Sequence, residues 1–252
     1  MRPDWPLTRD LVLIGGGHAH ALVLRRWAMD PLPGARLTLI DPAPSAAYSG
    51  MLPGFVAGHY GRDDLAIDLP ALARAAGARM VLAEATAFDP ARRLVKVAGR
   101  PPVAYDVASV DIGVTTAMTL PGFAEHGVPA KPFRAFGLRW AAFRERAEPP
   151  RIAILGGGVA GAELAMAMAH ALRDREPTIR LIDRSRALTE VDGPARRRLR
   201  AALDRWRIDL LEETTAQAVE EGGVRLADGT LIEAGLVVGA AGARPYDWPA
   251  HS

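Results

Sequence analysis

GGGHAH at residues 15–20 and GGGVAG at residues 156–161 are the two stretches that decide the fold of this 252-residue chain. Each follows a short apolar run, at residues 11–14 and 152–155, and each precedes an apolar, alanine-rich stretch typical of a helix. A strand, a glycine-rich turn and a helix in this order predict the start of a βαβ unit that binds a nucleotide. The motifs start 141 residues apart (156 minus 15), which indicates duplication of a whole domain.

The second motif satisfies the complete GxGxxG pattern through Gly156, Gly158 and Gly161. The first glycine permits a tight turn, the second lets the backbone approach a pyrophosphate, and the third lets the helix pack against the strand. Free N–H groups at the helix N-terminus attract phosphate. Asp183 ends the next apolar run, 22 residues after Gly161 (183 minus 161), where a carboxylate accepts hydrogen bonds from ribose hydroxyls. We therefore predict a dinucleotide site at this turn.

Asp183 also indicates which dinucleotide binds. A carboxylate at this place repels a 2′-phosphate, so NADH is expected rather than NADPH. Arg184 and Arg186 follow closely and keep NADPH as the less favoured alternative.

The first motif is less regular. Gly15 and Gly17 supply the first two glycines, but His20 stands where the third belongs, and Asp41 follows 21 residues later (41 minus 20). A side chain at that place should push the helix outward or change its direction, and we expect His20 to have a packing role. His18 is expected near the pyrophosphate. A metal site is not expected, because the two histidines diverge and no carboxylate-rich partner lies near.

The composition excludes several classes of function. The chain has no cysteine, so it has no thiolate metal site, disulfide or redox-active cysteine pair, and electron transfer requires a bound cofactor. It has no run of 18 or more apolar residues and no signal-peptide pattern, so no integral membrane segment and a cytoplasmic location are expected. The net charge is only +2, and the arginine run at 196–200 predicts a solvated helix face rather than a phosphate, lipid or nucleic-acid site.

The order of GGGHAH, Asp41, a flexible apolar loop and GGGVAGAE resembles the pyridine nucleotide–disulfide reductase superfamily. In that superfamily the first unit holds FAD and the second, inserted unit holds NAD(P)H. The loop at residues 48–58, YSGMLPGFVAG, resembles the flavin-contacting loop of type II NADH dehydrogenases. With GHY at residues 58–60, the similarity is closer still to the flavoprotein module that precedes selenide, water dikinase in some bacterial fusion proteins. The resemblance covers nearly the whole chain.

The resemblance implies an α/β fold with two Rossmann-like, three-layer dinucleotide-binding units, the second inserted in the first. The implied FAD-binding unit covers residues 1–116, with 241–252 returning to it, and the implied NAD(P)H-binding unit covers 117–240. Members of the superfamily continue with a Gly-Asp strand and an interface domain, and nothing matching lies between Ala243 and Ser252. We therefore expect the C-terminal part of the FAD unit to be missing and flavin binding to be weakened or absent.

The implied activity is hydride transfer from NADH to FAD and on to a small-molecule acceptor that is not a protein dithiol. A non-catalytic regulatory module of a larger selenium-metabolism protein is the alternative, and a homodimer and a fused partner domain both stay open. Glu163 is implied to orient the nicotinamide, although an ordinary first-turn glutamate favoured by the helix dipole explains it equally well. The implied FAD contacts are Gly15, Gly17, His18, Asp41, Tyr48, Ser49, Met51, Leu52 and Pro53.

The hydrophobic patterns predict further elements in both halves. Helices are expected at 18–29, 70–76, 131–147 and in the arginine-rich stretch near 196–203. Strands are expected at 36–41, 79–87, 93–97, 107–112, 179–183, 208–211, 215–220, 223–226 and 236–240.

Overall fold

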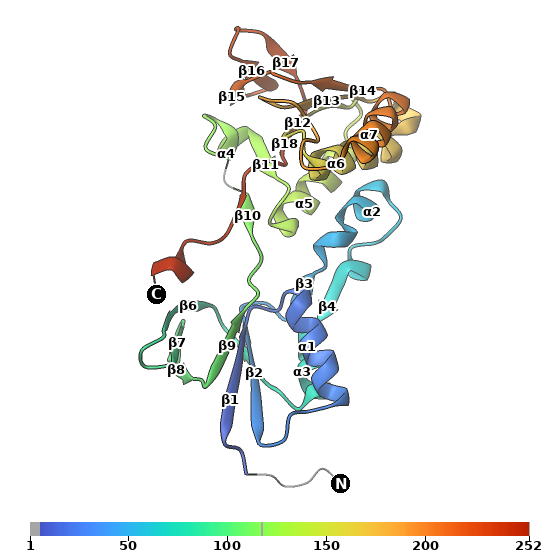
Figure 1. The fold of residues 1–252 in the computed structure, drawn as a ribbon. Helices are drawn as coiled ribbons and strands as arrows, with labels where there is room; N and C mark the ends of the chain where they lie inside the picture. Colours follow the sequence, from blue (N-terminus) through green and yellow to red (C-terminus); the bar gives the residue numbers. More distant parts are fainter. Residues whose placement is uncertain (1–5, 117, 252) are drawn as a thin grey trace. The chain divides into compact units, whose positions relative to one another are not determined.

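A computed structural model describes residues 6–116 and 118–251 of the chain. The chain forms two compact units, and each is described by itself (Figure 1). The first contains Met1–Tyr48, Asp63–Gly113 and Pro245–Ser252, and the second contains Ser49–Arg62 and Val114–Arg244. The second unit is therefore inserted in the first, as the resemblance implies, although Ser49–Arg62 groups with the second unit instead of the first.

The first unit has three layers around a parallel sheet of order β5-β2-β1-β9. Helices α1 and α3 cover one face, and the antiparallel sheet β6-β7-β8 covers the other (Figure 1). The bounds are β1 (Arg9–Ile14), α1 (His18–Met29), β2 (Ala35–Asp41), α3 (Leu69–Ala76), β5 (Arg79–Leu82), β6 (Ala85–Asp89), β7 (Leu94–Val97), β8 (Arg100–Ala104) and β9 (Val107–Val110).

Alternation of side chains along β1 builds both interfaces of this unit. Val12 and Ile14 pack in a cluster with the antiparallel sheet, whereas Leu13 packs in a cluster with α1 and α3. Successive side chains of a strand point to opposite faces, so an apolar run is required where both faces are covered. The run LVLI meets this requirement.

The second unit repeats the plan. Its parallel sheet has the order β11-β18-β12-β13-β14, with one apolar cluster shared with the helices and a second shared with the antiparallel sheet β15-β16-β17. The bounds are β11 (Gly127–Pro129), α5 (Phe133–Arg144), β12 (Arg151–Leu155), α6 (Val159–Ala171), β13 (Thr178–Ile182), α7 (Gly193–Arg205), β14 (Ile208–Leu211), β15 (Ala216–Glu220), β16 (Gly223–Leu226), β17 (Leu231–Glu233) and β18 (Leu236–Gly239).

Short elements complete both units. In the first, β3 pairs with β4, and in the second, β10 pairs with β19. Single-turn 3₁₀ helices lie at Ser49–Met51, Asp63–Leu65, Arg173–Arg175 and Trp248–His251. The remaining bounds are β3 (Ser45–Ala47), α2 (Leu52–Ala57), β4 (Ala66–Asp68), β10 (Thr115–Thr116), α4 (Phe123–His126) and β19 (Ala243–Arg244).

Several predicted elements differ from the observed ones. The single strand predicted at 79–87 is two strands, β5 and β6, which belong to different sheets. The helix predicted at 131–147 is shorter, because it begins after Pro132 and ends at Arg144. Strand β8 was not predicted, since its sequence RPPVA contains two prolines, which are tolerated at a sheet edge. No helix in the described part of the chain is long and apolar enough to cross a membrane.

The helical layer of the second unit offers a test of its packing. Phe136 of α5 is fully buried, whereas Leu138, two residues on, is 55% exposed. We expect Phe136→Ala to lower the free energy of unfolding by about 3–5 kcal/mol, the usual cost of emptying a buried aromatic site. Leu138→Ala, the matched control, should change it by less than about 0.5 kcal/mol. Urea unfolding followed by tryptophan fluorescence measures both, and equal effects of the two substitutions would contradict the packing.

Candidate functional site

The two glycine turns have the same backbone arrangement. Gly15 and Gly156 both have positive φ, +89° and +118°, a region that favours glycine. The N–H of Gly15 donates to the carbonyl of Ile40 at 2.8 Å, and the N–H of Gly156 donates to the carbonyl of Ile182 at 2.8 Å. Each turn is therefore held against the end of the neighbouring parallel strand.

The predicted acidic residues hold the same turns. Asp41 accepts a hydrogen bond from the N–H of Gly16 at 2.6 Å, and Asp183 accepts one from the N–H of Gly157 at 2.7 Å. The other carboxylate oxygen of Asp183 accepts the N–H and the hydroxyl of Ser185, both at 2.8 Å. Each carboxylate oxygen has two lone pairs, so both residues keep the capacity to accept further hydrogen bonds from a ligand.

The two units differ at the position of the third glycine of the motif, which is Gly161 in the second unit and His20 in the first. A Cβ on Gly161 would overlap the carbonyl oxygen of Gly156, so this helix start requires glycine. In the first unit His20 is 2% exposed, and its Nδ1 lies 2.6 Å from the carbonyl oxygen of Gly15. Its Nε2 lies 2.9 Å from the hydroxyl of Ser109. The carbonyl only accepts, so Nδ1 donates, and the predicted packing role of His20 is confirmed.

A carboxylate lies at the N-terminus of each glycine-turn helix. At α1, the N–H of His20 donates to Asp111 at 3.2 Å, and at α6, the N–H of Val159 donates to Glu190 at 2.6 Å. A Cβ on Gly17 would overlap the Asp111 carboxylate, and a Cβ on Gly158 would lie 2.7 Å from Glu190. The middle glycines that admit a pyrophosphate in this motif therefore admit a protein carboxylate here.

The loop that carries Glu190 is anchored by two of its backbone N–H groups. The N–H of Leu188 donates to the carbonyl of Gly157 at 2.9 Å, and the N–H of Ala187 donates to Glu212 at 2.7 Å. Arg200 also hydrogen-bonds to Glu212 and lowers the pKa of that carboxyl. The loop therefore follows the glycine turn closely.

The prediction of a solvated helix face is wrong for two arginines of α7, which hydrogen-bond to other parts of the protein. Arg196 donates to the carbonyls of Leu188 and Val191, both at 2.9 Å, and Arg200 pairs with Glu212. Arg197 and Arg198 are exposed, as predicted. The sequence did not show these bonds, because Leu188 and Val191 precede α7 and Glu212 follows it, and the fold brings them to the arginines.

The predicted flavin-contacting loop divides between the units. Tyr48 belongs to the first unit, is 42% exposed, and its ring lies 5.9 Å from that of His18. Ser49, Met51, Leu52 and Pro53 belong to the second unit, where α2 packs on α6 and Leu52 is buried. Their role at a flavin stays a prediction.

Glu163 lies on the exposed side of α6, and no hydrogen bond or ion pair joins its side chain to another residue within 6–116 and 118–251. Its proposed role at the nicotinamide also stays a prediction. The same described residues contain no group of three or more His, Asp or Glu side chains placed to hold a metal ion.

The duplicated turns and three-layer units define a class of proteins, those with two tandem dinucleotide-binding units. Residues 9–250 match the family described as pyridine nucleotide-disulphide oxidoreductase, and the chain belongs to this family. A comparison with curated proteins finds no match.

Solved structures with the same fold include reduced CoADR-RHD from Bacillus anthracis, at a TM-score of 0.84 and 19% identity over 98% of this chain and 46% of that one. The water-forming NADH oxidase from Lactobacillus brevis bound to NADH is similar at a TM-score of 0.78 and 18% identity, over 94% of this chain and 54% of that one. NDH2 from Plasmodium falciparum in complex with NADH is similar at a TM-score of 0.78 and 14% identity, over 95% of this chain and 56% of that one. The chain thus spans about half the length of these proteins.

Sequence reasoning did not identify Asp111 and Glu190 as site residues. Asp111 directly follows β9, a strand that ends at the same edge of the sheet as β1, and that position was the available signal. Glu190 had no comparable signal, because it lies in an irregular loop seven residues after Asp183 (190 minus 183).

The buried histidine of the first turn can be tested directly. We expect His20→Ala to lower the free energy of unfolding by about 1–3 kcal/mol, because it leaves the Gly15 carbonyl and the Ser109 hydroxyl without a partner. His18→Ala, at an exposed neighbouring position, is the control and should have little effect. Chemical denaturation gives both values, and a neutral His20→Ala would show that the histidine does not hold the turn.

Proposed function

We propose that this chain is the nucleotide-binding part of an FAD-dependent oxidoreductase that takes hydride from NADH and passes electrons to a small-molecule acceptor. The observation that carries the proposal is the duplicated turn, in which a positive-φ glycine and a carboxylate after the second strand recur in both units. The family supports NAD(P)H-dependent oxidoreduction in general, and NADH, FAD and the acceptor are the proposed specifics.

The second unit fits NADH. The N–H groups of Gly158 and Ala160 have no acceptor among the described residues and lie at the start of α6, where a phosphate is favoured. Asp183 lies beside this turn with lone pairs available for ribose hydroxyls, and its charge opposes a 2′-phosphate. These features support NADH over NADPH.

The first unit fits the adenosine and pyrophosphate part of FAD. Gly15 and Gly17 shape the turn, His18 is exposed at the helix start, and Asp41 lies beside the turn as Asp183 does in the second unit. Bound flavin would supply hydride acceptance and onward electron transfer. Glu163 would orient the nicotinamide by proximity and charge.

The acceptor is proposed to be a quinone, dioxygen or an oxidised sulfur or selenium species, since the chain has no cysteine to form a dithiol. A non-catalytic nucleotide-sensing module of a larger selenium-metabolism protein is the second candidate. The carboxylate of Asp111 favours it, because it lies where the pyrophosphate of FAD would bind and opposes its charge, and a chain that binds NADH without flavin would sense it without transferring hydride.

The visible spectrum of the purified protein after incubation with FAD and desalting tests the first candidate. We expect a flavin absorption band that bleaches anaerobically faster with NADH than with NADPH. Glu163→Gln should slow bleaching about tenfold or more without changing NADH affinity, which corresponds to roughly 1.4 kcal/mol in the barrier. Glu221→Gln, an exposed residue of the same unit, should behave as the wild type. A flavin spectrum that the protein leaves unchanged even in excess FAD would reject the oxidoreductase proposal for this chain, and bound flavin that NADH does not bleach would favour the sensing module.

The carboxylate of Glu190 at the N-terminus of α6 gives a separate prediction. Glu190→Gln keeps the side-chain shape but removes the charge that competes with a bound pyrophosphate. We expect ADP-ribose to bind about three- to tenfold more tightly, a gain of roughly 0.7–1.4 kcal/mol. Isothermal titration calorimetry at low salt measures the change, with Glu221→Gln as the control. Unchanged or weaker binding by Glu190→Gln would show that Glu190 does not compete with the phosphates.

A further inference from the structure

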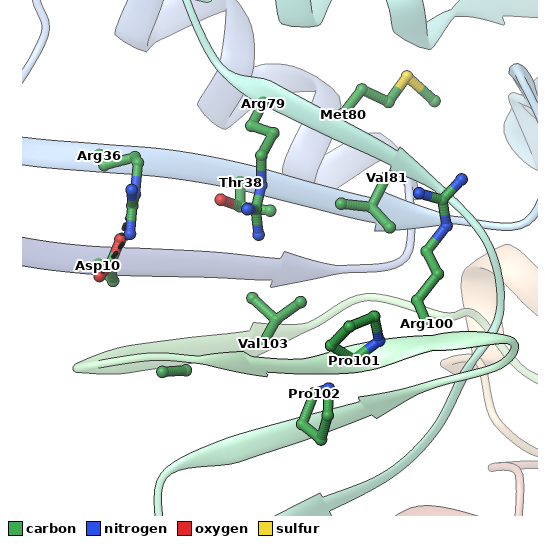
Figure 2. A pocket seen from close by; sticks show the side chains of 11 residues that line it. Asp10, Arg36, Thr38, Arg79, Met80, Val81, Arg100, Pro101, Pro102 and Val103 are labelled. Carbon is green, nitrogen blue, oxygen red and sulfur yellow. Dashed lines mark hydrogen bonds and ion pairs between the residues drawn. The ribbon is translucent and has the colours of Figure 1, made fainter.

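The first unit contains a cavity of about 370 Å³ that lies away from its glycine turn. Figure 2 shows its lining, which comes from β1, β2 and β5 on one side and from β8 on the other. Asp10 lies near the start of β1, whereas the glycine turn begins at Gly15, five residues on (15 minus 10). At about 3.3 Å per residue, the cavity mouth is therefore roughly 16 Å from the turn along this strand.

Strand register places four polar or charged residues side by side in the lining. Asp10 is paired across the parallel strands with Arg36, and Thr38 is paired with Arg79. Side chains two residues apart on a strand share a face. Arg36 and Thr38 therefore lie on the same face of β2 as buried Ile40, which is the face that packs against the antiparallel sheet. The cavity thus has a charged mouth and an apolar interior.

The charges at the mouth do not balance. Asp10 binds Arg36 through two hydrogen bonds, at 2.6 and 2.9 Å, and this pairing raises the pKa of the guanidinium. Arg79 and Arg100 also line the cavity, and neither side chain has a hydrogen bond or ion pair to any residue that the structure describes. Three arginines against one aspartate leave a net charge of +2 on the lining.

The other walls favour a small ligand. Thr38 is 2% exposed at the base of the cavity, and Val81 and Val103 contribute apolar surface. Pro101 and Pro102 of β8 have no backbone N–H, so this strand cannot take on an added β-strand along its whole length. The volume lies at the lower end of the range typical of small-molecule pockets.

We propose that this cavity binds a small phosphate monoester, with the dianionic phosphate between Arg79 and Arg100 and its organic group against Val103 and Pro101. Two guanidinium groups match the charge of the phosphate and can donate in pairs to its oxygens. The site is separate from both glycine turns and is independent of the proposed redox function.

Phenyl phosphate is the probe, titrated into the purified protein by isothermal titration calorimetry at constant ionic strength. The glycine turns also attract phosphate, so the titration is run in saturating ADP-ribose and FAD. We expect saturable binding at one site per chain. The double variant Arg79→Gln/Arg100→Gln should weaken it at least tenfold, with an unchanged thermal melting curve.

The matched control removes two charges elsewhere in the same unit. Arg25→Gln/Arg74→Gln changes exposed arginines of α1 and α3 that do not line the cavity, and it should leave phenyl phosphate binding within twofold of the wild type. Equal weakening by both double variants would show a diffuse charge effect and overturn the site. Wild-type binding by Arg79→Gln/Arg100→Gln, or no binding in saturating ADP-ribose and FAD, would overturn it as well.

Discussion

In each unit the residue that follows the first glycine of the motif, Gly16 or Gly157, donates its N–H to a carboxylate at the end of the second strand, Asp41 in the first unit and Asp183 in the second. This bond ties the turn after the first strand to the neighbouring strand. The start of the helix, the direction of its free N–H groups and the place of the carboxylate all follow from it. A charged acceptor makes the bond stronger than one between neutral groups, which suits a turn that has to hold its shape for a ligand.

The two units accommodate the carbonyl of the first motif glycine, which faces the start of the helix, in different ways. The second uses Gly161, which lets the helix backbone approach the carbonyl of Gly156. The first places the ring of His20 in that space and satisfies the equivalent carbonyl of Gly15 with a hydrogen bond. A histidine here therefore does not abolish the motif. It exchanges a backbone contact for a buried polar one, and it depends on Ser109 from the neighbouring strand β9.

Much of the fold could be predicted because its signals are local. Strand, glycine turn and helix are contiguous at residues 11–29 and 152–171. Strand β2 ends at Asp41 as expected, and Asp183 directly follows β13, which ends one residue earlier than expected. Elements with weak local signals were missed. Strand β8 contains two prolines, and β6 was merged with β5, because the sequence does not show where a strand leaves one sheet for another. The flavin contacts and the role of Glu163 stay predictions.

The sequence by itself determined the duplicated motif, the acidic residue that follows each one and the absence of cysteine chemistry, since residue type and short spacing carry this information. Only the tertiary structure decided which distant groups meet the turns. Asp111 reaches α1 from 91 residues away along the chain, and Glu190 reaches α6 from 31 residues away. Arg36, Arg79 and Arg100 likewise come together only through strand register and the packing of two sheets. Such contacts depend on backbone paths through space, which spacing along a chain does not encode.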